Sequence, residues 1–206
     1  MRRVVIKFGG SLLDLADWPE RLDAWLRTQE PAQWLLVVGC GEWGDSLRHW
    51  DERLHLGDRF CHRLCARLLT MTAELAEQVL AREGRHSLSV RRAASLTELR
   101  SERLGDEHDS RSCITVFDAG SFLLGEALEA SDPLPEDWSV TTDSIAAEIA
   151  WLWPADELVL FKSCAHPAPG DWTRAADEGA VDQAFPPRAA RLPYVTWVDL
   201  RTNYGV

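Results

Sequence analysis

Short apolar runs of strand length, separated by segments with helical spacing, constrain the fold of this chain most. Strands that alternate with helices pair in parallel and carry helices on both faces of the sheet. The apolar runs occupy residues 3–8, 34–38, 113–117, 158–161 and 194–198, and the clearest helical patterns lie at 18–27, 58–83 and 142–153. The sequence predicts a three-layer α/β/α sandwich with a mostly parallel sheet, in a single domain over residues 1–206.

The longest helical segment, residues 58–83, carries a regular apolar stripe. Residues that recur every three or four positions lie on one face of a helix. The members of this stripe are Phe60, Leu64, Leu68, Leu75 and Val79. We predict that this face is buried.

Both lysines of the chain lie at the ends of predicted strands. Lys7 follows an apolar run at 4–6 and Lys162 follows one at 158–161, whereas all the other basic residues are arginines. Ligands of open α/β sheets bind at the carboxyl ends of the strands, and a lysine ammonium is a compact donor on a flexible stem. The pair therefore points to a phosphate-handling site. The alternative is that both side chains merely reach solvent from strand ends.

Glycine turns follow the first two predicted strands. The first turn is Gly9-Gly10-Ser11 and the second begins at Gly39-Cys40-Gly41. Glycines let backbone amides approach phosphate oxygens, and the start of the following helix favours an anion. We predict two phosphate-cradling turns side by side, although a purely structural turn explains the first pair of glycines equally well.

The second turn also fits the G-x-G-x-x-G pattern of dinucleotide-binding proteins, because Gly44 follows Gly39 and Gly41 at the required spacing. That pattern would indicate a dehydrogenase. However, it follows the second strand rather than the first, and no strand ending in an acid lies about 20 residues on. A second phosphate turn explains the glycines better.

A cluster of hydroxyls and one carboxylate opens the helix predicted from Thr141 or Thr142 to Trp153. Asp143 lies in its first turn, next to Ser144. An acid there is explained in part by helix capping and the helix dipole. In addition, Asp143 is placed to hold both lysine ammonium groups by charge-assisted hydrogen bonds.

Charge and cysteine content narrow the classes of partner. A net charge of -11 disfavours nucleic acids and anionic membranes as partners. With no signal peptide, no apolar run of membrane-spanning length and an odd number of scattered cysteines, the chain is predicted to be a cytoplasmic protein with reduced thiols. Cys61, His62 and Cys65 resemble a metal cluster only weakly, because no second ligand pair follows, so we predict no metal-binding residues.

Together these motifs resemble the amino acid kinase superfamily over residues 3 to about 185. The segments that carry the resemblance are Val5–Ser11, the turn at Gly39–Gly41, Thr142–Ser144 with the following helix, and Leu158–Lys162. The resemblance implies an amino acid kinase-like fold that uses ATP and Mg²⁺. It also implies that Lys7 contacts the transferring phosphoryl group, that Asp143 organises the lysines and that Lys162 is the second cation.

Binding residues are predicted from the resemblance and from the positions of side chains near the second turn and on the long helix. Phosphate and nucleotide binding falls to Gly9, Gly10, Ser11, Thr142 and Ser144. Substrate binding falls to Gly39, Cys40, Gly41, Arg48 and His62. A buried or surface histidine without a binding role is an open alternative for His62. Glu42 or Asp45 could meet an amine, although acids in a first helical turn are common for dipole reasons alone.

Within the superfamily, the segment Glu178–Asp182 with Phe185-Pro186 and the short length resemble the small kinases that act on [5-(aminomethyl)furan-3-yl]methyl phosphate in methanofuran biosynthesis. The chain departs from larger members in two places. Cys40 interrupts their glycine triplet, and Ser163–Pro167 replaces their Asp-rich turn, with only about 40 residues remaining. The nucleotide region at the C-terminal end is therefore predicted to be shortened.

The expected function is phosphotransfer from ATP to a small phosphomonoester that bears an amine. Two alternatives remain open. One is a kinase that forms an acyl phosphate from a carboxylate, and the other is a non-catalytic sensor of nucleotide or metabolite. Relatives in the superfamily suggest association into a homo-oligomer.

Overall fold

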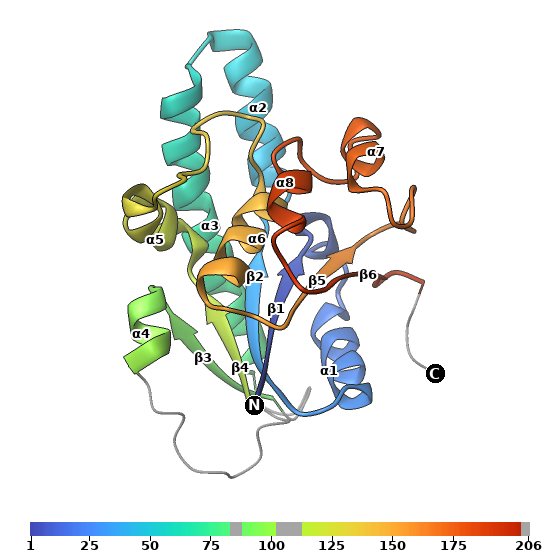
Figure 1. Ribbon diagram of the computed structural model, residues 1–206. Helices are drawn as coiled ribbons and strands as arrows, with labels where there is room; N and C mark the ends of the chain where they lie inside the picture. Colours follow the sequence, from blue (N-terminus) through green and yellow to red (C-terminus); the bar gives the residue numbers. More distant parts are fainter. Residues whose placement is uncertain (83–87, 102–112, 203–206) are drawn as a thin grey trace.

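A computed structural model of the protein describes residues 1–82, 88–101 and 113–202. Six strands form one sheet in the order β3-β4-β2-β1-β5-β6 (Figure 1). Their bounds are β1 (Arg2–Phe8), β2 (Ala32–Val38), β3 (Ser89–Ala93), β4 (Cys113–Phe117), β5 (Glu157–Lys162) and β6 (Val195–Asp199). Every strand pair in the described chain is parallel, so the sheet is more uniform than the mostly parallel one predicted.

The sheet is buried on both faces, which confirms the predicted three layers. Along β1, Val5 packs into one hydrophobic cluster, whereas Val4 and Ile6 pack into another on the opposite face. Side chains of a strand alternate between faces, so each apolar run supplies two cores. The first cluster is covered by α5 (Ala119–Leu124), α6 (Thr142–Leu152) and α8 (Phe185–Ala189), and the second by α1 (Trp18–Thr28).

The other helices are α2 (Glu42–Leu54), α3 (Asp58–Leu80), α4 (Leu96–Ser101) and α7 (Trp172–Asp177), with short 3₁₀ helices at Gly10–Leu12 and Glu126–Glu129. Of these, α3 also packs against the second cluster, whereas α4 and α7 pack against the first. In Figure 1, α2 and α3 rise beyond the ends of the strands, above the edge where β1 and β2 finish. Helices α5 and α8 were not predicted from the sequence.

Strand register brings the predicted site together at one edge. β1 lies between β2 and β5, with Phe8 opposite both Val38 and Phe161. The residues that follow these three strands therefore meet at the same end of the sheet. They include the two glycine turns, and Lys7 and Lys162 lie beside them in the last residues of β1 and β5.

The buried face of α3 differs from the predicted stripe. Phe60 is 52% exposed and Leu75 is 41% exposed. The residues that are buried instead are mostly small: Cys61, Ala66, Leu69, Thr72, Ala73, Ala76 and Leu80. Close packing explains the difference, because α5 approaches so near that a Cβ on Gly120 would lie 1.9 Å from the carbonyl oxygen of Ala66. Large side chains would not fit where α3 and α5 meet, at Ala66 and Gly120.

No helix in the described ranges combines the length and the apolar character that a membrane span requires. The described strands all belong to one sheet. The extent of a single domain over residues 1–206 stays a prediction.

Candidate active site

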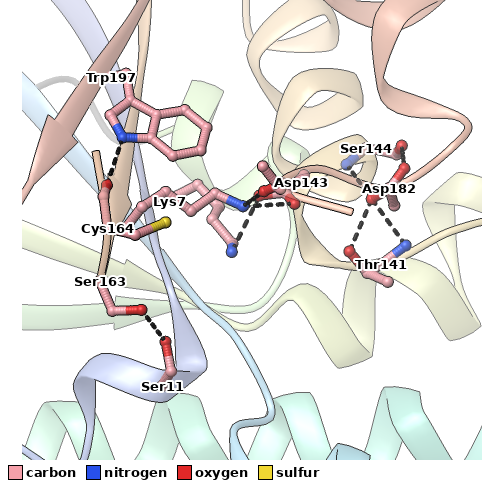
Figure 2. Close-up of polar contacts among 11 residues, drawn as sticks. Lys7, Ser11, Thr141, Asp143, Ser144, Ser163, Cys164, Asp182 and Trp197 are labelled. Carbon is pink, nitrogen blue, oxygen red and sulfur yellow. Dashed lines mark hydrogen bonds and ion pairs between the residues drawn. The ribbon is translucent and has the colours of Figure 1, made fainter. Parts of the chain in front are cut away.

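Asp143 links both lysines at the carboxyl ends of β1 and β5. The Lys7 ammonium lies 3.0 Å from Asp143 Oδ1, and the Lys162 ammonium donates a hydrogen bond of 2.8 Å to Oδ2 (Figure 2). The Lys7 contact is a buried ion pair. We call these three residues the lysine–aspartate triad. The structure brings them together as predicted, and their chemical roles stay predictions.

The triad is almost fully buried and carries a formal charge of +1. Side chains of Lys7, Asp143 and Lys162 are 8%, 5% and 12% exposed. Burying an ion costs several kcal/mol even after relaxation, so ion groups of this kind are weak devices for stability. A buried excess of positive charge at a ligand-binding edge is better explained as a site for an anion.

Burial and neighbouring charges together lower the pKa values of Asp143 and Lys162. Burial raises the pKa of Asp143, but the positive charges of Lys7 and Lys162 outweigh it and leave that pKa below its ordinary value. Burial, and then the charge of Lys7, lower the pKa of Lys162 to about 8, against the opposing effect of Asp143. Two buried ammonium groups share one carboxylate, which explains why Lys162 releases its proton more easily.

The two glycine turns lie against each other. A Cβ on Gly10 would lie 2.1 Å from the backbone nitrogen of Gly41, and Gly41 itself has a left-handed φ of 58°. The Gly39 amide also donates to the carbonyl oxygen of Phe8. Side chains are therefore excluded where the backbones of the turns meet, as the interpretation of paired phosphate turns requires.

We expect Gly10→Ala to destabilise the protein by about 1–3 kcal/mol, because its Cβ would push into backbone that cannot move aside. The matched control is Gly44→Ala within α2, where the added Cβ meets only the Cys40 side chain at 3.0 Å. Chemical denaturation measures both variants. Equal stability of the two would contradict the close approach of the turns.

A cavity of about 260 Å³ opens between the turns, α3 and the start of α6. It is lined by most of the residues predicted for the site: Lys7, Gly10, Ser11, Gly39, Cys40, Gly41, Arg48, His62 and Thr142. Gly9, Asp143, Ser144 and Lys162 do not line it. The cavity is large enough for a small metabolite, and its charged lining groups include Lys7, Arg48 and Asp45.

Arg48 is held in the cavity wall by an aromatic contact that the sequence did not indicate. Its guanidinium lies 4.7 Å from the centre of the Trp138 ring. The Trp138 indole donates a 2.7 Å hydrogen bond to Asp51, which also accepts from the Gly57 amide at 3.0 Å. The segment before α6 is thereby fixed to the turn between α2 and α3, over the cavity.

Several other predicted residues have defined surroundings. Burial lowers the pKa of His62, against the opposing charges of Glu136 and Asp137. Burial raises the pKa of the Cys40 thiol to about 12, which disfavours a reactive thiolate in the cavity. The Ser11 hydroxyl donates to Ser163 at 3.0 Å and joins the first glycine turn to the segment after β5.

Ser144 and Thr141 both form hydrogen bonds at the start of α6, and of the two Thr141 also lines the cavity. Ser144 is fully buried and its hydroxyl donates to Asp182 (Figure 2). Thr141, the N-cap residue, makes no side-chain cap of its own, and its hydroxyl also donates to Asp182 at 2.8 Å. The helix therefore starts where the sequence predicted, at Thr141 or Thr142, but the side chain of its N-cap residue bonds Asp182 and caps no helix amide. Asp182 was not predicted as a site residue.

The donor set fits a polyphosphate. The backbones of Gly10 and Gly41 meet so closely that no side chain fits between them, and the adjacent triad supplies positive charge. Among the described residues, no group of three or more histidine, cysteine or acidic side chains is arranged to hold a metal ion. Any Mg²⁺ at such a site would therefore depend mainly on phosphate oxygens.

Solved structures with the same fold include kinases of nucleoside monophosphates. Uridylate kinase from Archaeoglobus fulgidus shares 15% identity with a TM-score of 0.59, covering 97% of this chain and 92% of that chain. UMP kinase from Bacillus anthracis shares 14% identity with a TM-score of 0.64, covering 98% and 88%. UMP kinase from Ureaplasma parvum shares 13% identity with a TM-score of 0.60, covering 96% and 90%.

Sequence comparisons with curated proteins and with protein families gave different results. Curated protein sequences gave no significant match. The sequence model of the Amino acid kinase family matches residues 2–165, which include the whole triad but end before Asp182. This chain belongs to the amino acid kinase family.

Proposed function

We propose that the chain transfers a phosphoryl group from ATP to a small phosphomonoester that bears an amine, such as [5-(aminomethyl)furan-3-yl]methyl phosphate, and forms a diphosphate. The observation that carries this proposal is the triad, a buried group of net positive charge beside two glycine turns. Phosphoryl transfer depends on positioning and on charge neutralisation more than on covalent help from the protein.

Each residue of the triad has a distinct part in this proposal. When bound, ATP supplies the phosphoryl group and Mg²⁺ neutralises charge on the phosphate oxygens. Lys7, which lines the cavity, contacts the transferring group. Lys162 supplies the second positive charge, and Asp143 keeps both ammonium groups in place. The amides of Gly10 and Gly41 bind phosphate oxygens, whereas those of Gly9 and Gly39 already donate to the carbonyl oxygens of Phe161 and Phe8.

The cavity lining supports an acceptor that carries both charges. Arg48 offers a planar pair of donors to a phosphate, and its contact with Trp138 holds it in the wall. Asp45, on the same wall, offers a carboxylate to an amine. A carboxylate acceptor would also pair with Arg48, so a kinase that forms an acyl phosphate is the second candidate. We also propose that the protein acts in methanofuran biosynthesis, is located in the cytoplasm and assembles into a homo-oligomer.

Thermal unfolding with Mg-ATP, Mg-ADP, NAD or no ligand tests the proposal first. Ligand at about 100 times its dissociation constant stabilises a protein by roughly 2.7 kcal/mol, or roughly 5–10 °C at this chain length. We expect shifts with the adenine nucleotides and none with NAD. Phosphorus NMR then follows transfer to phosphomonoester and carboxylate acceptors. Nucleotide binding without transfer would favour the sensor, and a shift with NAD alone would favour a dehydrogenase.

Activity should fall at alkaline pH if the charge of Lys162 is needed. With a pKa of about 8, Lys162 is charged below that pH and loses its proton as the pH rises through it. The profile of kcat/KM, which reports the free enzyme, should therefore decline above about pH 8. Lys162→Arg should remove this decline, because a guanidinium stays charged. A decline that persists in Lys162→Arg would assign it to another group.

A further inference from the structure

The start of α6 is capped by a residue that lies far along the chain. Thr141 and Ser144 are the N-cap and the third residue of the first turn, and both direct a backbone amide and a hydroxyl at Asp182. The two amide bonds measure 2.9 and 3.0 Å. The first amides of a helix have no partner within it, so Asp182 supplies the cap that the local sequence does not. Figure 2 shows this carboxylate beside Asp143.

The same segment also holds Lys162. The carbonyl oxygen of Ala180 accepts a 2.7 Å hydrogen bond from the Lys162 ammonium, and the Ala184 amide donates to the carbonyl oxygen of Ser139 at 3.1 Å. Residues 180–184 thus run beside the segment that enters α6. We call them the strap. The strap contacts two of the elements that carry the triad, and it lies beyond the residues matched by the family model.

Burying the Asp182 carboxylate next to Asp143 is energetically unfavourable. This cost indicates that the position of Asp182 serves a purpose. Asp182 is 8% exposed, and burial, followed by the negative charge of Asp143, raises its pKa. An ordinary helix cap can be made by a serine or threonine at the N-cap itself. The structure instead brings a second carboxylate close to the carboxylate that holds the lysines.

We propose that Asp182 is a positioning residue: by capping α6 from the strap, it fixes the direction of Asp143 and hence the separation of Lys7 and Lys162. Its catalytic consequence rests on the proposed phosphotransferase function. Its structural consequence does not, because the positions of the two lysines are observable without any substrate.

Another buried aspartate offers a matched control. Asp118 caps α5 and accepts from the Ser121 amide at 2.9 Å, from the Ser121 hydroxyl at 2.8 Å and from Thr70 at 2.8 Å. It is 3% exposed, and none of these three bonds reaches a residue of the triad. Asp118→Asn therefore reproduces the loss of a buried cap without touching the strap.

NMR of the protein with isotope-labelled lysine tests the proposal directly, because the chain has only two lysines and each gives one side-chain ammonium signal. We expect Asp182→Asn to move both signals and Asp118→Asn to move neither. The Lys7 signal is the decisive one. Loss of the Asp182 charge alone would act on Lys162, whose pKa it raises, so movement of Lys162 without Lys7 would overturn the positioning role.

Kinetics give the second readout. A displacement near 1 Å at a reacting group lowers turnover by about 100-fold. We expect a loss of this size in kcat for Asp182→Asn, with a smaller change in KM, whereas Asp118→Asn keeps its kcat. Equal kcat in the two variants would contradict the proposal. Absence of transfer by the unmodified protein would instead refute the proposed function and leave the NMR test intact.

If Asp182→Asn does not fold, a milder variant still tests the proposal. Ser144→Ala removes one hydroxyl donor to Asp182 and keeps every charge. It should move the Lys7 signal in the same direction by a smaller amount. An unmoved Lys7 signal in a folded Ser144→Ala protein would count against the positioning role.

Discussion

Lys7→Ala is expected to lower turnover by about 100- to 1,000-fold, the usual effect of removing one donor to charge that develops in a transition state. The loss follows from position. Lys7 is the residue of the triad that lines the cavity, and its ammonium is directed there from the end of β1. Assay of phosphoryl transfer at saturating ATP measures the change.

The fold should survive this substitution. Asp143 keeps its 2.8 Å bond to Lys162, so one buried ion pair of balanced charge remains. Removal of the Lys7 charge also removes the repulsion that lowers the pKa of Lys162, so that pKa should rise above about 8. Arg67→Ala on the exposed side of α3 is the control for loss of a basic residue. Nearly full activity of a folded Lys7→Ala protein would refute the proposed mechanism.

The triad was predictable from the sequence for a simple reason. Lys7 and Lys162 end two apolar strands, and parallel strands place their carboxyl ends at one edge of the sheet. Asp143 opens a helix that packs over β1, so its first turn reaches the same edge. These predictions used only the direction of strands and the start of a helix.

The buried face of α3 was not predictable in the same way. Hydrophobic spacing selected the bulky residues, whereas the close approach of α5 and the sheet selected alanines. Which of two apolar stripes faces inward depends on the distance to the neighbouring layer. That distance arises only when the elements pack.

Asp182 was missed because its partners are distant in sequence. Thr141 and Ser144 lie about 40 positions earlier, and the order of residues gives no sign of the four bonds that join them to one carboxylate. The sequence gives only indirect signs that Asp182 caps this helix. A helix start rich in hydroxyls that needs a partner, and a lone acid inside an apolar segment at 180–185, are each compatible with burial.

Asp143→Asn should have the largest effect on stability of any substitution in the triad. It removes the carboxylate that both buried ammonium groups contact, and breaking a buried ion pair costs about 3–5 kcal/mol. The cost should depend on pH, because the Asp143 charge opposes the lowering of the Lys162 pKa. Without that charge, the pKa of Lys162 in the folded state falls below about 8, further from the value near 10.4 of an unfolded lysine.

The sign of the pH dependence follows from proton binding. Between the two pKa values of Lys162, the unfolded state binds one more proton than the folded state, so stability rises with pH by up to about 1.4 kcal/mol per unit. In the variant this rise begins at a lower pH than in the unmodified protein. The deficit of Asp143→Asn should therefore be larger at about pH 6 than at about pH 8.

Chemical denaturation at the two pH values measures this difference. Asp23→Asn is the control, since Asp23 is also a buried carboxylate but pairs with Arg27, whose side chain is 63% exposed. Loss of a pair with an exposed partner costs about 1 kcal/mol or less, and no buried lysine is left behind to lose a proton. A deficit for Asp143→Asn that is the same at both pH values would mean that Lys162 keeps its proton without Asp143, and that Asp143 does not control the charge of the triad.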